Sequence, residues 1–166
     1  KDGSKINTYA DLQSAVDAAT SGDTIKINKD VDITGGVYIK GKNLTIDGDN
    51  HILNGSTWLN SIFVVEEDAT LEINNLTIDG GSSGFKVNYE AINVFNKSTS
   101  IPLISGSDST DVKLNISPII LKGKLLFNNS SVNNSYVVGN GGAINIVSGE
   151  FTALNSKFNH NRSDAG

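Results

Sequence analysis

Hydrophobic residues recur at helical spacing only near the start of the chain, between residues 8 and 20. The residues that share this apolar stripe are Tyr9, Leu12, Val16 and Ala19. Thr8 stands where an N-cap is expected, Asp11 follows three residues later as in a capping box, and Gly22 stops the segment. The pattern predicts one amphipathic helix over residues 8–20.

After Gly22 the spacing of apolar residues changes from the helical period to two. Short alternating runs, among them TIKI, VYI, LTI and LEI, are separated by Asn, Gly, Asp or Lys. Such alternation is typical of β-strands that bury one face. The chain also contains 21 Asn and 17 Gly, residues that tolerate the positive φ angles of tight turns. Many short strands joined by sharp corners are therefore expected.

An internal repeat connects these strands. The defining copy consists of Leu71, Ile73, Asn75, Ile78 and Asp79. Residues of similar kinds recur 54 positions later as Leu125, Phe127, Asn129, Val132 and Asn133, and 80 positions later as Phe151, Ala153, Asn155, Phe158 and Asn159. The opening copy is matched to Val37, Ile39, Asn43, Ile46 and Asp47, with two extra residues in its corner. Each copy predicts a strand, a corner containing Asn, and a second strand.

The length of the repeat indicates a β-helix. The corner asparagines lie 32, 54 and 26 residues apart, and one turn of a β-helix takes about 20–30 residues. In such a fold each strand pairs in parallel with its equivalents one turn away, and equivalent Asn side chains can stack along the axis. We predict an all-β fold, a parallel β-helix or β-solenoid, whose first turn is capped by the helix. Its structural ladder would consist of Asn43, Asn75, Asn129 and Asn155.

The repeat also suggests how the chain is organised. At 166 residues a single domain is expected, with a capping helix at 8–20 and coils at 24–95 and 124–166. A strand of the coil is expected to restart at Ala91, because EAINV resembles the later GAINI. Residues from about 96 to 123 contain both prolines and are interpreted as a protruding insertion, with an irregular extra coil as the alternative. The abrupt ends favour the N-terminal part of a longer repeat protein.

Composition and charge narrow the class further. The net charge is −5 and no Lys or Arg run stands out, so a nucleic-acid partner is not expected. The chain has no Cys, which excludes a disulfide scaffold and thiolate chemistry. No stretch reaches the length of a membrane span, and no signal peptide is visible. We expect a monomer without a cofactor.

The last third and the opening resemble a known group of surface proteins. GGAI (141–144) and FNHN (158–161) resemble the GGA[ILV] and FxxN tetrapeptides of chlamydial polymorphic outer-membrane proteins. Adhesin-like surface proteins of methanogenic archaea and of some bacteria carry similar repeats, and residues 8–33 and the two NLTIDG phrases also look like theirs. The resemblance implies a right-handed parallel β-helix of the pectate-lyase type, displayed outside the cell. It carries over no functional residue.

Asp47 and Asp79 are the sharpest suggestion of catalysis. Glycoside hydrolysis uses two carboxylates, and on neighbouring turns about 4.8 Å apart the pair would have a suitable separation. Asn133 and Asn159 occupy the same place in later copies, however, so the position favours a turn-forming residue. The NTD and GHG signatures of polygalacturonase-like hydrolases are missing, and Arg162 is the only Arg for a lyase base. We predict no catalytic residue and no enzyme activity.

Other candidate sites are weaker. His51 and His160 are the only histidines, lack metal-ligand spacing, and are interpreted as solvated turn residues. The acidic runs at 66–68 and 107–111 match no calcium loop, so no metal site is predicted. Aromatic residues that could stack on sugars are Trp58, Tyr89 and Tyr136. Sequons for N-glycosylation begin at Asn43, Asn54, Asn75, Asn96, Asn115, Asn128, Asn129, Asn133 and Asn161.

These observations favour a cell-surface adhesin module. The stiff stack would hold loops away from the cell and mediate attachment to the surface of another cell, a protein or a glycan. The segment at about 96–123 is the predicted binding loop, because function often lies in excursions from a rigid scaffold. Two alternatives stay open: a fragment of a polysaccharide lyase or glycoside hydrolase, and a purely structural cap for further repeats.

Overall fold

The structure is a computed structural model that describes residues 10–55, 61–80, 117–137 and 140–163. Within these ranges one helix, α1 (Leu12–Ala18), precedes a series of short strands. Sheet A contains β1 (Thr24–Lys26), β4 (Asn43–Asp47), β7 (Thr70–Asn74), β10 (Lys124–Asn128) and β14 (Glu150–Leu154). Sheet B contains β2 (Val31–Asp32), β5 (Ile52–Asn54), β8 (Thr77–Asp79), β11 (Ser131–Asn133) and β15 (Lys157–Asn159). Sheet C contains β3 (Val37–Ile39), β6 (Phe63–Val65), β9 (Ile119–Leu121) and β13 (Ile144–Ile146), and β12 (Tyr136–Val137) pairs with β16 (Arg162–Ser163).

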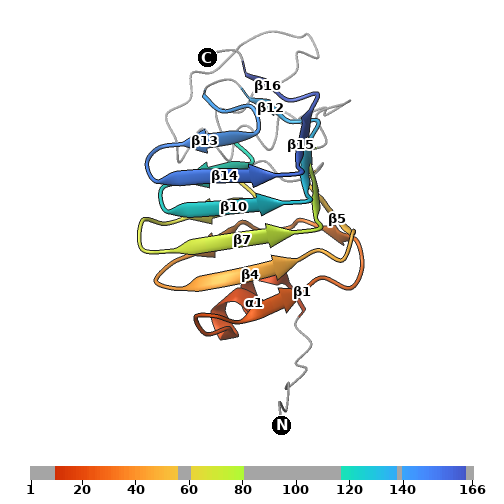
Figure 1. Ribbon diagram of the computed structural model, residues 1–166. Helices are drawn as coiled ribbons and strands as arrows, with labels where there is room; N and C mark the ends of the chain where they lie inside the picture. The colour runs from red at the N-terminus through yellow and green to blue at the C-terminus, as the bar shows by residue number, and fades with distance from the viewer. Residues whose placement is uncertain (1–9, 56–60, 81–116, 138–139, 164–166) are drawn as a thin grey trace, which may run out of the picture.

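The chain visits the three main sheets in a fixed order. Each visit to sheet A is followed by a strand in sheet B and then, in the first four passes, by one in sheet C; we call one such pass a rung. Neighbouring rungs pair strand by strand, and every strand pair described is parallel. In Figure 1 the strands of sheet A lie one above another from β1 to β14. This mostly-β arrangement is compatible with the predicted parallel β-helix.

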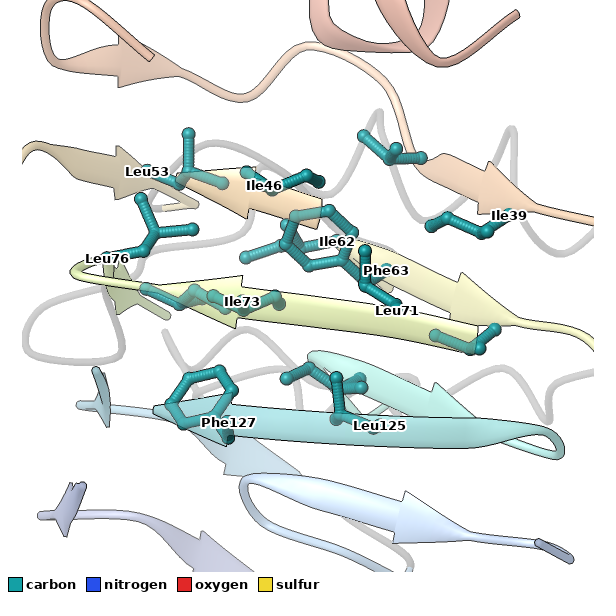
Figure 2. Packing of buried hydrophobic residues seen from close by; sticks show 14 of the residues in the cluster. Ile39, Ile46, Leu53, Ile62, Phe63, Leu71, Ile73, Leu76, Leu125 and Phe127 are labelled. Carbon is teal, nitrogen blue, oxygen red and sulfur yellow. The ribbon is translucent and has the colours of Figure 1, made fainter. Parts of the chain in front are cut away.

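The alternation read from the sequence places the apolar residues in columns that run through the rungs. One column in sheet A pairs Leu44, Leu71, Leu125 and Phe151 in register, and another pairs Ile25, Ile46, Ile73, Phe127 and Ala153. Sheet B contributes Val31, Leu53, Ile78, Val132 and Phe158. In the middle rungs these side chains are fully buried, and Figure 2 shows them packed between the sheets. The burial of branched aliphatic side chains is thus the main stabilising contribution.

Helix α1 lies at the β1 end of the stack, as Figure 1 shows. It begins later than predicted: Asp11 is the N-cap and accepts a hydrogen bond from the Ser14 amide at 2.8 Å, whereas Thr8 lies outside the described residues. Val16 and Ala15 are buried against the first rung. The Gln13 side chain bonds both backbone groups of Tyr38 on β3, accepting from its N–H at 2.6 Å and donating to its carbonyl at 3.4 Å. The Gln13 side chain thereby makes the two backbone hydrogen bonds that a neighbouring strand would otherwise make.

The opposite end of the helix is held by a lysine. The Lys42 ammonium donates to the carbonyl oxygens of Val16 and Ala19 at 3.0 and 2.8 Å. These carbonyls belong to the last turn of the helix, where backbone acceptors lack partners within the helix and the macrodipole favours a cation. Polar contacts at both helix ends therefore fix α1 on the first rung.

The two copies of NLTIDG do not have the same structure. In the first copy, 43–48, the residues NLTID form the sheet A strand β4. In the second copy, 75–80, Asn75 forms a corner and only TID is a strand, β8 of sheet B. Asp47 therefore pairs with Asn74, and Asp79 pairs with Asn54. The opening copy of the repeat was aligned wrongly from the sequence, because the same letters serve two different places in a rung.

The irregular step of 54 residues lies within a single rung. Leu71 of β7 pairs directly with Leu125 of β10, so sheet A contains no extra strand between them. After β8 the next described strand is β9, which pairs with β6. The predicted range of 96–123 is wrong at its C-terminal end, because residues 119–121 form β9 of sheet C. Residues 96–116 lie outside the described residues, so the insertion and its alternative, an extra coil, both stay predictions. The predicted restart at Ala91 lies outside the described residues.

Candidate functional site: the polar corners

The first corner, between sheets A and B, carries a column of left-handed Asn residues. Asn75, Asn129 and Asn155 each directly follow a sheet A strand and have φ angles of 52°, 48° and 49°. Among non-glycine residues Asn is one of those that adopt this conformation most readily. The Asn129 amide donates to Asn75 Oδ1 at 2.7 Å, and Asn75 Nδ2 donates to Asp47 Oδ1 at 3.1 Å. The side chains of Asn75 and Asn129 are thus hydrogen-bonded in a ladder that ends on Asp47.

Asn43 does not belong to this column. It is the first residue of β4, pairs with Thr70, and its backbone N–H donates to Ser21 Oγ at 2.8 Å. Because Asp47 pairs with Asn74, the residue equivalent to Asn75 in this rung is Gly48. A Cβ on Gly48 would lie 2.5 Å from the Asn75 carbonyl oxygen, so only Gly fits there. The two extra residues of the opening copy lie in the 48–51 corner, after β4.

Serine hydroxyls bridge the same corner, a role the sequence reading missed. Ser130 Oγ accepts the N–H of Leu76 from the rung below at 3.1 Å and donates to the Asn128 carbonyl at 2.8 Å. Ser156 repeats this: it accepts the Ser130 N–H at 3.3 Å and donates to the Leu154 carbonyl at 2.8 Å. The sequence signal was the Asn-Ser pair that follows both strands. The Leu76 and Ser130 N–H groups are therefore satisfied by a side chain of the next rung, and the Asn75 and Asn129 N–H groups by its backbone carbonyls.

The second corner, after the sheet B strands, is built in a similar way. Asn134 and His160 have φ angles of 55° and 53° at equivalent positions. The Asn134 amide donates to both carboxylate oxygens of Asp79, at 3.3 and 3.2 Å. Asn161 accepts the N–H of Ser135 at 3.1 Å and donates to a backbone carbonyl at 2.7 Å. His160 thus lies at a corner, as its interpretation as a turn residue predicts, whereas Asp79 is the last residue of β8 and accepts hydrogen bonds from the corner residue Asn134.

Asp47 and Asp79 do not form the carboxylate pair considered from the sequence. Asp47 ends a strand of sheet A, whereas Asp79 ends a strand of sheet B, so the two are not equivalent residues of successive rungs. The hydrogen bond from Asn75 lowers the pKa of Asp47, and the Asp49 N–H adds to this effect. A group held ionised by hydrogen bonds is a poor general acid near neutral pH. Both carboxylates act as acceptors for corner amides.

The remaining titratable candidates make separate polar contacts. His51 Nδ1 lies 3.2 Å from Asp30, whose carboxylate also accepts the Ile52 N–H at 2.9 Å; this last bond is the main reason that the pKa of Asp30 is lowered. Glu66 pairs with Lys122 at 3.0 Å. Asp68 accepts the Gly41 N–H at 2.9 Å. The acidic run at 66–68 is therefore divided between two contacts.

Two further sets of predicted residues are only partly described. Tyr136 and Arg162 are register partners in the β12–β16 pair, whereas Trp58, Tyr89 and the run at 107–111 lie outside the described residues. Of the sequons, those at Asn96 and Asn115 also lie outside. Two others, at Asn128 and Asn133, have their Ser buried, at 5% and 2% exposure for Ser130 and Ser135. The folded corner withholds these two hydroxyls from solvent.

Within the described ranges, no three His, Cys, Asp or Glu side chains come together as a metal site would require. The helix there is also too short and polar to cross a bilayer. Comparisons with protein-family models, curated proteins and solved structures gave no match. The likeness to adhesin-like proteins therefore rests on the sequence motifs alone.

Proposed function

We propose that the chain is a rigid scaffold module of a surface adhesin, built as a right-handed parallel β-helix and capped by α1. The observation that carries this proposal is the strand-by-strand parallel register of successive rungs, with aliphatic columns inside and polar corners outside. Right-handed crossovers between parallel strands are the strong general preference. A stack of this kind is stiff along its axis because each rung is hydrogen-bonded to the next.

The connection between β8 and β9 is the place where such a scaffold would carry its ligand contacts. It joins Gly80 to Ser117, and the equivalent positions one rung earlier are Gly55 and Ser61. There the connection is only five residues long, Ser-Thr-Trp-Leu-Asn. Residues 81–116 are therefore an addition to a pattern that closes without them, which is typical of a functional excursion.

The register supplies a matched deletion to test this role. Replacing residues 81–116 with Ser-Thr-Trp-Leu-Asn joins Gly80 to Ser117 through the shorter connection of the preceding rung. We expect the shortened protein to keep its cooperative unfolding and to lose binding to cell surfaces and glycan arrays. The full chain is the positive control.

Each other outcome points to a different function. If the shortened protein binds like the full chain, the insertion is not the binding site. If neither protein binds any cell, protein or glycan surface, the purely structural cap, which the helix-covered end favours, replaces the adhesin proposal. Turnover of uronate or neutral glycans that Asp79→Asn abolishes would establish an enzyme instead.

A further inference from the structure

The C-terminal face of the stack, which we define by β13, β14 and β15, leaves core positions uncovered. Phe158 is register partner of Val132, and Ile146 of Leu121. The two inner residues are completely buried, whereas Phe158 is 39% exposed and Ile146 is 51% exposed. Val147 beside it is 61% exposed. Apolar columns that are buried in the inner rungs thus become exposed at this face.

Strand edges are also open on this face. Within the described part of the chain, β14 and β15 have a neighbour on one side only, because each is the last strand of its sheet. At the opposite end α1 covers the first rung and Gln13 bonds the β3 edge. An uncovered edge with apolar flanks is a template for an added strand.

The corner hydrogen bonds have a direction that specifies what can be added. The Leu76 N–H donates to Ser130 of the following rung, and the Ser130 N–H donates to Ser156. In the second corner the Ser135 N–H donates to Asn161 in the same direction. In these three bonds from backbone N–H groups the acceptor comes from the rung on the C-terminal side, whereas the side-chain amides of Asn75 and Asn129 donate toward the N-terminal side. A segment that covers this face in the same way must bring a Ser or Asn side chain to each corner.

We propose that the C-terminal face binds an extended polypeptide segment as one further parallel rung. Its required pattern is that of residues 124–133: apolar residues at the positions of Leu125 and Phe127, Asn-Ser at the corner, and an apolar residue at the position of Val132. A second copy of the chain does not supply this rung, since its own first rung is covered by α1. The inference extends the proposed scaffold and uses residues other than the insertion.

The test uses the full chain and a peptide that copies residues 124–137. We expect saturable binding, a higher melting temperature, and amide chemical-shift changes confined to 150–159, with none in β1 or β4. A peptide of the same composition in scrambled order is the control. Phe158→Asp in the protein is expected to weaken binding at least about tenfold, because it places a charge against the apolar column. Tyr38→Asp, a substitution of another exposed aromatic residue at the other end, is expected to leave binding unchanged.

Three results would overturn the inference: no shift at millimolar peptide, equal binding of the scrambled peptide, or a dimer of the chain that already occupies this face. If Phe158→Asp lowers the melting temperature by itself, Phe158→Ala replaces it, since it shortens the apolar side chain at the same position without adding a charge. The shortened variant with residues 81–116 replaced retains this face. Peptide binding and cell binding can therefore fail independently.

Discussion

The two ends of the stack begin from the same strand pattern and finish differently. At the first rung α1 covers the apolar side chains, and Val16 is only 2% exposed. At the last rung Phe158 continues a sheet B column, yet it is 39% exposed and has Phe127 and Phe151 as ring neighbours at 5.7 and 6.0 Å. Alternation decides which way a side chain points, but burial depends on the element that covers it.

The largest expected effect comes from introducing Asp at a buried position at one end and at a partly exposed position at the other. Val16→Asp buries a carboxylate between α1 and the first rung and is expected to cost about 3–5 kcal/mol of unfolding free energy. Phe158→Asp loses partial burial and two ring contacts, and about 1–2 kcal/mol is expected. Urea titration followed by circular dichroism measures both values. Equal losses would mean that the C-terminal face is as well covered as the capped one.

Substitution of glycines compares a tightly packed position inside the stack with an open position on its surface. A Cβ on Gly123 would meet the carbonyl oxygens of Glu66 and Ala69, so Gly123→Ala is expected to cost about 2–3 kcal/mol through overpacking. Gly35 has nothing within 4 Å of the corresponding position, and Gly35→Ala is expected to change stability by less than about 1 kcal/mol. Thermal melts of the two variants separate these expectations. If Gly123→Ala is as stable as the unchanged protein, the backbone around Gly123 can move away to make room for the methyl group.

Removing the hydrogen bonds that Gln13 makes at the cap is expected to cause the next largest loss of stability. Gln13→Ala removes both side-chain bonds to Tyr38 and is expected to cost about 1–2 kcal/mol. Gln13→Glu retains the acceptor for the Tyr38 N–H and should lose less. Hydrogen exchange at the Tyr38 amide reports the contact directly, since its protection should fall in the Ala variant. Unchanged protection would leave apolar packing and the Lys42 bonds as the contacts that hold α1 on the first rung.

The corner Asn residues compare an inner rung with the last one. Asn129→Ala loses the bond to Asn75 and also forces Ala into a positive φ, so about 1–3 kcal/mol is expected. Asn129→Gly keeps the backbone free and isolates the side-chain bond, which should cost about 1 kcal/mol. Asn155→Ala, in the same conformation on the outermost strand, is expected to cost less than Asn129→Ala. The opposite order, measured by denaturation, would argue against a ladder.

The residues that the sequence predicted well are those whose role is local. Alternation identified Leu71, Ile73 and Ile78 as core positions, and the helical stripe identified Val16, because a side chain's direction follows from its own strand or helix. The interruption of the repeat was also visible, since the corner residues Asn75 and Asn129 lie 54 positions apart. These features need no knowledge of which strand lies next to which.

The failures concern register between rungs. NLTID is compatible with a five-residue strand and with a corner followed by a strand, and only pairing with β7 or with β11 distinguishes the two. Asn43 was therefore assigned to the ladder although it begins β4. The Ser130 bridge was missed for a related reason, because its partner Leu76 is 54 residues away. Parallel register is set by contacts that a short stretch of sequence does not contain.

Acid sensitivity is the smallest expected difference between the ends. Hydrogen bonds lower the pKa of four carboxylates near the capped end, namely Asp11, Asp23, Asp30 and Asp47, each mainly through a bond from a Ser14, Thr20, Ile52 or Asn75 donor, respectively. A lowered folded pKa means that the native state binds fewer protons than the unfolded chain. The stabilisation is therefore complete at pH values above the pKa of an unfolded carboxyl group, and it is lost as the pH falls through the lower pKa of the folded state.

Stability should consequently be flat from pH 7 to about 5 and fall below about pH 4, with the capped end responding first. Strands β4 and β10 offer a matched pair, since each is next to an outermost strand of sheet A. Hydrogen exchange at pH 3 is expected to lose more protection in β4 than in β10, relative to pH 7. Asp47→Asn keeps an acceptor for Asn75 without the titrating charge and should reduce that difference. If β4 and β10 lose protection equally, the carboxylates near the capped end are not the cause of the acid sensitivity.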